Sequence, residues 1–359
     1  MSSAPPEFDR PSTRHVGTPE EHAPERDQRR FVVAVLVSCL VLLGAVLALN
    51  VTADPFALAG TRVVPTAVEN DRGIKLTLIE ELKTGPGVLI LGSSRARQAE
   101  PSVLQKLTGH TGFNAAVTGG TAADAYVFAR YAAEVFPRQK RRYVWFVDVG
   151  VATNGVNPQL EDDPRAKKYL RGNAQFGLED VGTYLGTQAT AASWRVFRKC
   201  VLAKCRPRIR YNPDGSIPHG RLRYLPERTR NLQAAVAKLV QSIRRNPPGA
   251  PSVDPRRYVF LERALAYMNA RGERPVIVLN PIYPTVLAEL EKYGFPQRKA
   301  SLEYLRKLHR RFDFVLVNCQ DIRKWGGSPT NFSNATHVDW LNMRRMLRYI
   351  DARSDGALR

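Results

Sequence analysis

Short apolar runs alternate with segments of helical spacing over most of the chain after residue 86. Five runs have the length of buried strands: Val88–Leu91, Gly112–Ala116, Tyr143–Val147, Pro275–Asn280 and Phe314–Asn318. The spacing of apolar residues predicts helices over about Pro101–Leu107, Thr121–Val135, Arg257–Arg271, Lys299–Arg310 and Leu341–Ile350. This alternation predicts an α/β fold, a three-layer sandwich with a mostly parallel sheet and helices on both faces.

A run of about twenty apolar residues, Phe31–Leu49, precedes these elements. At a rise of about 1.5 Å per residue, a helix of this length spans the roughly 30 Å hydrocarbon core of a bilayer. Three arginines lie between residues 26 and 30, and the first basic residue after the run is Arg62. The positive-inside rule therefore places the N-terminus in the cytoplasm and the large domain outside. Cleavage of the run as a signal peptide, after Val51-Thr52-Ala53, is the alternative.

These patterns divide the chain into four parts. They are a disordered polar tail (1–30), a transmembrane helix (31–50), a juxtamembrane connector (51–86) and an α/β domain (87–353). Within the connector, Ile74–Leu82 has helix-like spacing. Residues of about 155–254 are irregular and basic, and we expect an insertion over the strand ends, helical in part.

The charge of the chain is strongly positive, with a formal net charge of +21. Residues 1–50 hold five arginines and six acidic residues, so the excess lies in the large domain. Such a field favours polyanions, namely acidic polysaccharide, teichoic-type polymer, anionic lipid headgroups or nucleic acid. A domain outside the cell disfavours nucleic acid as the partner. Candidate substrate-binding residues are Arg95, Arg206, Arg208 and Arg210.

Cysteine spacing gives no indication of a metal site. The four cysteines are Cys39, Cys200, Cys205 and Cys319, and none forms a Cys-x-x-Cys or Cys/His pattern. Cys200 and Cys205 are five positions apart, and both a disulfide and two free thiols are compatible with that spacing. We expect neither a metal nor another cofactor.

The strand Val88–Leu91 is followed by Gly92-Ser93-Ser94-Arg95. This places a serine hydroxyl at the carboxyl end of a strand, where α/β proteins have their binding and catalytic sites. A serine becomes a nucleophile only with a base within hydrogen-bond reach. Of the six histidines, His337 is the candidate base, because the others lie in the tail, in polar turns or on a charged helix. The alternatives are a serine-rich loop that caps the next helix and a surface or capping histidine.

These motifs resemble those of the SGNH (GDSL-like) hydrolase superfamily, which has a flavodoxin-like fold. They are most similar to its membrane-anchored exported branch, which includes alginate O-acetylation proteins and the D-alanyl transfer protein of teichoic acids. The resemblance covers about 87–154 and 275–350. The family's Gly-Asp-Ser block corresponds to Gly92-Ser93-Ser94, which implies that Ser94 is the nucleophile and that its N–H is an oxyanion donor. The block Asn-x-Gly-x-x-Gly corresponds to Asn114–Gly119, without its first glycine, and gives Gly119 the oxyanion-hole position.

Two blocks depart from the family pattern. For the block Gly-x-Asn-Asp, the match is Gly150–Asn154. Asn154 stands two positions further from the glycine than the family's Asn, and no Asp follows it. We retain Asn154 as a third candidate oxyanion donor. For Asp-x-x-His, the match is Asn334-Ala335-Thr336-His337, with Asn334 in place of the orienting Asp. In a serine protease that replacement lowers kcat by roughly 10⁴, because the imidazole takes the wrong tautomer. Asn334, Asp339 and a main-chain carbonyl are the candidates for orienting His337.

The resemblance implies an exported serine esterase or O-acyltransferase that acts on acyl esters, acetyl in this branch, of a cell-surface polysaccharide or other anionic glycan. It implies anchorage in the cytoplasmic membrane by one helix, no cofactor, and a membrane-bound acyltransferase as a candidate partner. The alternative is a non-catalytic SGNH-fold protein that binds glycan, or serves as a scaffold, in envelope polysaccharide assembly. The departure at Asn334 motivates that alternative.

Overall fold

The chain forms two units in the computed structural model, Met1–Ala48 and Leu49–Arg359. The structure describes residues 23–53, 71–148, 156–161, 163–170, 186–200, 211–218, 226–249 and 258–359. Its helices are α1 (Ala23–Ala53), α2 (Asp71–Glu80), α3 (Pro101–Thr108), α4 (Ala122–Val135), α5 (Pro158–Glu161), α6 (Pro164–Leu170), α8 (Thr187–Cys200), α9 (Pro226–Arg245), α10 (Val259–Ala270), α11 (Pro284–Lys292), α12 (Pro296–His309) and α13 (Trp340–Ala352).

Helix α1 contains the predicted apolar segment and extends beyond it at both ends. Its valine and leucine side chains between Val32 and Leu43 are largely exposed. In the described part of the chain, Asp27–Ala53 is the one helix that is long and apolar enough to cross a membrane. The prediction of a segment able to span a bilayer is confirmed to that extent.

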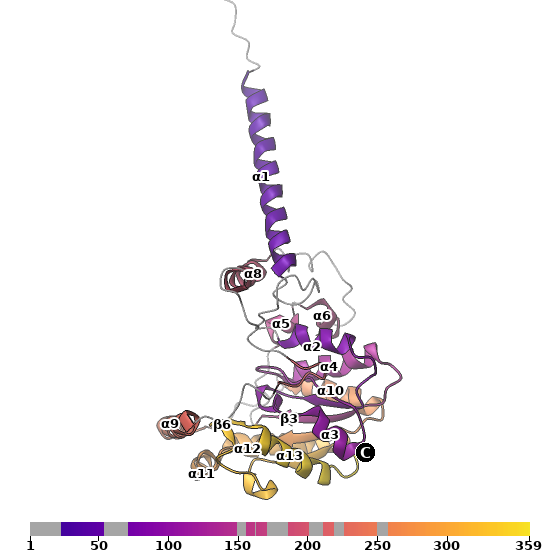
Figure 1. The fold of residues 1–359 in the computed structure, drawn as a ribbon, viewed down its shortest axis with the longest axis vertical. Coiled ribbons are helices and arrows are strands. Elements are labelled where there is room, and N and C mark those ends of the chain that lie inside the picture. The colour runs from indigo at the N-terminus through magenta and orange to yellow at the C-terminus, as the bar shows by residue number, and fades with distance from the viewer. Residues whose placement is uncertain are drawn as a thin grey trace, which may run out of the picture. The chain divides into compact units, whose positions relative to one another are not determined.

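A five-stranded parallel sheet forms the centre of the second unit (Figure 1). The strands are β1 (Val88–Leu91), β2 (Gly112–Asn114), β3 (Arg142–Val147), β4 (Val276–Leu279) and β5 (Val315–Asn318). Their order is β2-β1-β3-β4-β5, and every neighbouring pair is parallel. All five strands coincide with the predicted runs, with boundaries that differ by at most two residues, and β3 begins one residue before its run, at Arg142. The prediction of an α/β fold with a mostly parallel sheet is confirmed.

Alternate residues of the strands belong to two separate buried clusters. Leu89 and Trp145 pack with residues of α2, α4 and α10, whereas Ile90 and Phe146 pack with residues of α3, α9 and α13. This follows from the strand period of two, because successive side chains point to opposite faces of a sheet. In Figure 1, α2, α4 and α10 accordingly lie above the strands, and α3 and α13 lie below them.

Helix α2 lies in the segment that the sequence assigned to a connector, yet it is part of the core. Leu76 and Ile79 are fully buried, and so are the charged side chains of Arg72 and Lys75. The compact α/β unit therefore takes in residues before the expected start at Gly87. The spacing of its apolar residues predicted this helix. The burial of its two charged side chains was not predicted, because charged residues are mostly exposed to solvent.

A short hairpin precedes the last helix and carries the predicted base. It consists of β6 (Phe332–Asn334) and β7 (His337–Val338), and Asn334 pairs with His337 across it. Asp339 follows and caps α13, accepting hydrogen bonds from the N–H groups of Leu341 and Asn342 at 3.0 and 3.1 Å. The hairpin is thus fixed to the helix immediately after it.

Candidate active site

The exit from β1 presents Ser94 at the carboxyl end of the sheet. Gly92 has φ +143°, and a Cβ on it would lie 2.8 Å from the carbonyl oxygen of Phe146, so only glycine fits this bend. Ser93 then caps a single 3-10 turn, η1 (Ser94–Ala96). Ser94, the first residue of that turn, is half-buried. The predicted sharp exit from the strand is what the structure shows.

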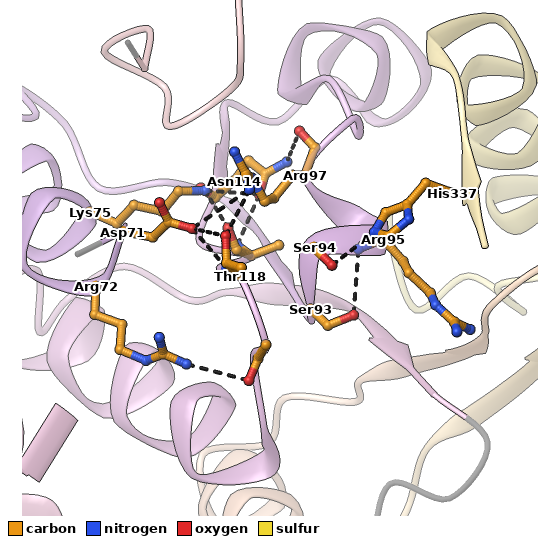
Figure 2. Close-up of polar contacts among 12 residues, drawn as sticks. Asp71, Arg72, Lys75, Ser93, Ser94, Arg95, Arg97, Asn114, Thr118 and His337 are labelled. Atoms are coloured by element: carbon orange, nitrogen blue, oxygen red, sulfur yellow. Dashed lines mark hydrogen bonds and ion pairs between the residues drawn. The ribbon is translucent and has the colours of Figure 1, made fainter. Parts of the chain in front are cut away.

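Ser94, His337 and Asn334 form a hydrogen-bonded relay. Ser94 Oγ lies 2.9 Å from His337 Nε2, and His337 Nδ1 lies 2.9 Å from Asn334 Oδ1 (Figure 2 shows the first contact). Ser94 and His337 are 243 positions apart in the sequence, so only the fold brings them together. The arrangement is that of a nucleophile, a base and an orienting group.

The surrounding donors determine which way the Asn334 amide faces. Asn334 Oδ1 accepts hydrogen bonds from the backbone N–H groups of Thr336 and His337 at 2.9 and 3.0 Å. Because both partners can only donate, the amide oxygen and not its NH₂ faces them, and it also faces Nδ1 of the ring. Nδ1 therefore carries the proton, and Nε2 is left as the acceptor for the Ser94 hydroxyl. Asn334 imposes the tautomer that a general base requires.

Asp339 does not take the orienting position that the sequence left open for it. Its carboxylate is buried and binds the N–H groups at the start of α13. Thr336 Oγ1, at 3.0 Å from Nδ1, is the additional group at the ring. The alternative of a surface histidine is also wrong, because His337 is half-buried and is bonded at both ring nitrogens.

The turn after β2 lies directly against the nucleophile turn. Val117 N–H donates to the carbonyl oxygen of Gly92 at 3.1 Å, and Gly120 lies against Gly92 and Ser93. Gly119 has φ +60° and is exposed. Among the described residues, no acceptor pairs with its backbone N–H. Within the described chain, Gly119 thus has an unpaired N–H in a turn whose next residue, Gly120, packs against Ser93, and an oxyanion donor needs an unpaired N–H.

Gly120→Ala is expected to lower kcat for ester hydrolysis by roughly 10² or more, because an error of about 1 Å at a reacting centre has that effect. A Cβ on Gly120 would lie 2.3 Å from the Gly92 carbonyl oxygen and 3.1 Å from Ser93 Cα, so the turn must move away from the nucleophile. Steady-state kinetics of the purified variant measure this. Gly249→Ala, where a Cβ meets no atom within 4 Å, is the matched control. Unchanged kcat in Gly120→Ala would contradict the assignment of this turn to the site.

Two buried side chains hold the two turns together: Asn114, which begins one of the sequence blocks, and Lys75, which the sequence did not single out. Asn114 Nδ2 donates to the carbonyl oxygens of Ala96 and Ala99 at 3.1 and 2.7 Å. Lys75 Nζ donates to the carbonyl oxygens of Asn114 and Ala116, each at 2.6 Å (Figure 2). Burial lowers the pKa of Lys75 well below its usual value. The sequence does not show that Lys75 is buried and not exposed to solvent, because its hydrogen-bond partners lie about 40 residues away along the chain.

Asp148, at the end of β3, supports the nucleophile turn from the other side. It accepts hydrogen bonds from Ser93 Oγ and Asn280 Nδ2, both at 2.8 Å, and its carboxylate pairs with Arg95 at 3.1 Å. In the sequence, Asp148 directly follows the predicted strand Tyr143–Val147, and Asn280 is the last residue of the predicted strand Pro275–Asn280. That position was the available signal for a shared role. Arg95, a predicted substrate-binding residue, therefore lies at the site and is already paired with an acidic side chain.

The electrostatic environment keeps the base neutral. Burial of His337 and the positive charge of Arg95 hold its pKa below 6.5, and Asp148 acts in the opposite direction. The neutral imidazole is the form that accepts the Ser94 proton. The site is therefore suited to remain competent below neutral pH.

The acid limb of kcat/KM is expected to have its midpoint below pH 6.5, because protonation of His337 removes the base. Arg95→Gln should move that midpoint to higher pH, because it removes the positive charge that lowers the pKa of His337 and leaves the negative charge of Asp148, which raises that pKa. A neutral nitrophenyl ester keeps any role of Arg95 in substrate binding out of the measurement. Arg138→Gln, at an exposed position, is the control. A midpoint that does not move in Arg95→Gln would contradict this account.

Other predicted residues lie outside the described part of the chain. These are Asn154, Arg206, Arg208, Arg210 and Cys205, together with the side chain of Cys200. Within the residues that the structure describes, no group of three or more His, Cys, Asp or Glu side chains is arranged to hold a metal ion.

Comparison with known proteins finds no family model that matches the chain and no curated relative. The arguments for function therefore rest on the residues of this site and on the motif resemblance.

Proposed function

We propose that the chain is an extracytoplasmic serine esterase or O-acyltransferase with an SGNH-like domain and the three-layer sandwich of that superfamily. The observation that carries the proposal is the relay of 2.9 Å contacts from Ser94 Oγ through His337 to Asn334. Each member occupies the position that the motif resemblance gives it. The site lies at the carboxyl end of a parallel sheet, where α/β proteins place their catalytic groups.

In the proposed mechanism, Ser94 Oγ attacks the carbonyl carbon of an acyl ester while His337 Nε2 takes the hydroxyl proton. The tetrahedral oxyanion receives hydrogen bonds from the N–H groups of Ser94 and Gly119, with Asn154 as a further donor. The ester C–O bond then breaks, and His337 returns its proton to the departing alcohol. Water or a sugar hydroxyl then attacks the acyl-enzyme and gives its proton to His337. The bond between the acyl carbon and Ser94 Oγ breaks as His337 returns that proton to Ser94 Oγ.

The acceptor we propose is a cell-surface polysaccharide or other anionic glycan. Helix α1 holds the protein in the cytoplasmic membrane with the N-terminus inside, by the distribution of arginines around it. The basic character of the large domain supports an anionic acceptor. A membrane-bound acyltransferase is the proposed source of the acyl group.

The test is a change in the ester content of an O-acylated acidic polysaccharide incubated with the full-length protein, followed by proton NMR. A decrease in ester signal, or an increase when an activated acyl ester is supplied, is expected from the native protein and not from Ser94→Ala. Salt-sensitive binding of the polysaccharide with no change in its ester content would contradict the proposal and favour a binding or scaffold protein.

A further inference from the structure

An apolar cavity of about 290 Å³ lies beside the relay. Its lining includes Arg95 and Thr336, the chain neighbours of Ser94 and His337, and Ala335 from the same hairpin turn. Thr336 also contacts the ring of His337 through its hydroxyl. Ser94 and His337 do not themselves line the cavity, but their chain neighbours do, so the cavity is adjacent to the relay.

The rest of the cavity is formed by two helices and the loops that follow β4 and α11. Its main apolar residues are Leu239, Ile243, Ile282, Val286, Leu290 and Phe295. In Figure 1, α9 and α11 lie side by side near β6. Ile243, Val286 and Phe295 are each less than 9% exposed, so the wall is part of the packed structure and not a loose surface.

The chemistry of the wall selects the part of the substrate that enters. Sugar hydroxyls would lose their hydrogen bonds to water against leucine, isoleucine and valine side chains, which is unfavourable. Three polar residues also line the cavity: the guanidinium of Arg95 is already paired with Asp148, Thr336 is bonded to His337, and Gln297 lies among the apolar residues. An alkyl chain loses nothing on entering and gains from leaving water. The cavity thus fits the acyl part of the ester, and the alcohol part must lie elsewhere.

The volume of the cavity is far larger than an acetyl group needs. A cavity of about 150 Å³ holds benzene, with six carbon atoms. By proportion, about 290 Å³ accommodates roughly twelve carbon atoms. An acetyl group would leave most of this apolar wall without contacts.

We propose that this cavity is an acyl-binding site and that the site prefers medium-chain acyl esters, of about six to twelve carbons, over acetyl esters. The proposal rests on the proposed function of Ser94, and it departs from the acetyl preference that the family resemblance implies. The chain enters between α9 and α11, with the carbonyl carbon held at Ser94 Oγ.

The experiment compares p-nitrophenyl acetate, butyrate, hexanoate and octanoate as substrates of the full-length protein in phospholipid nanodiscs. Each fully buried methylene favours binding by a factor of about four, so kcat/KM is expected to rise roughly 10²-fold or more from acetate to octanoate. Ser94→Ala measures the background hydrolysis of each ester.

Leu239→Trp is expected to fill the cavity and to lower kcat/KM for octanoate far more than for acetate, so that the preference moves to acetate or butyrate. Lys238→Trp is the matched control, because Lys238 is exposed on the same helix and does not line the cavity. Should Leu239→Trp fail to fold, Ile282→Phe narrows the same cavity from the loop after β4.

Three results are possible. A Ser94-dependent preference for octanoate that Leu239→Trp reverses and Lys238→Trp keeps supports the acyl-binding site. Ser94-dependent hydrolysis that has the same chain-length profile in Leu239→Trp as in the native protein, whichever ester is fastest, overturns the acyl-binding site and leaves the proposed function standing. The absence of Ser94-dependent hydrolysis for all four esters overturns the proposed function itself.

Discussion

Ser94→Ala and His337→Ala are each expected to lower kcat for hydrolysis of a nitrophenyl ester by roughly 10⁴ or more, because one removes the nucleophile and the other its base. Their contact of 2.9 Å means that neither acts without the other. The double variant should therefore be about as slow as either single variant, since residues that act as a unit give non-additive losses. Steady-state kinetics of the four proteins measure both effects.

The control for the serine change is Ser102→Ala, at an exposed position of α3. It is expected to leave kcat unchanged. A single variant at Ser94 or His337 that keeps a tenth of the native rate would contradict the assignment. So would losses that add in the double variant, because additivity indicates residues that act independently.

Asn334→Asp is expected to raise kcat by about tenfold at least, and at most by the roughly 10⁴ that separates Asp from Asn in a serine protease. The added carboxylate would keep the hydrogen bond to Nδ1 and would supply the negative charge that stabilises the imidazolium formed when Ser94 gives up its proton. A neighbouring negative charge favours the protonated ring, so the acid limb of kcat/KM should also move to higher pH.

Asn334→Ala is expected to have the opposite effect on rate, because it removes the acceptor that fixes the ring tautomer. Asn231→Asp, on the exposed side of α9, adds the same charge away from the ring and serves as the control. If Asn334→Asp leaves both kcat and the acid limb unchanged, Asn334 does not orient His337. The pH profile separates this role from a purely structural one.

The parts of the site that the sequence predicted are those that depend on local pattern. The exit of a short buried strand located Ser94, and the position before the last helix located His337. The geometry of the relay could not be predicted from the sequence, because the superfamily that the motifs resemble carries Asp at the position of Asn334. The structure shows that the amide oxygen is held toward the ring by two backbone donors, Thr336 and His337.

The parts that the sequence did not predict depend on contacts between distant segments. The Lys75 side chain can be buried because the carbonyl groups of Asn114 and Ala116 accept its hydrogen bonds. The apolar spacing of α2 gives no indication of these partners. Ser93 and Asp148 are bonded across 55 positions. The periodicity of apolar residues indicates which face of a helix or strand is buried, but it does not indicate which polar groups form hydrogen bonds in the buried region.

The most direct test of the account is mass spectrometry of the full-length protein after reaction with a fluorophosphonate. The account predicts one covalent adduct on Ser94, absent in Ser94→Ala and strongly reduced in His337→Ala, because only an activated serine reacts. No adduct on Ser94 in folded protein, or an adduct that forms equally well without His337, would contradict the assignment of a catalytic serine.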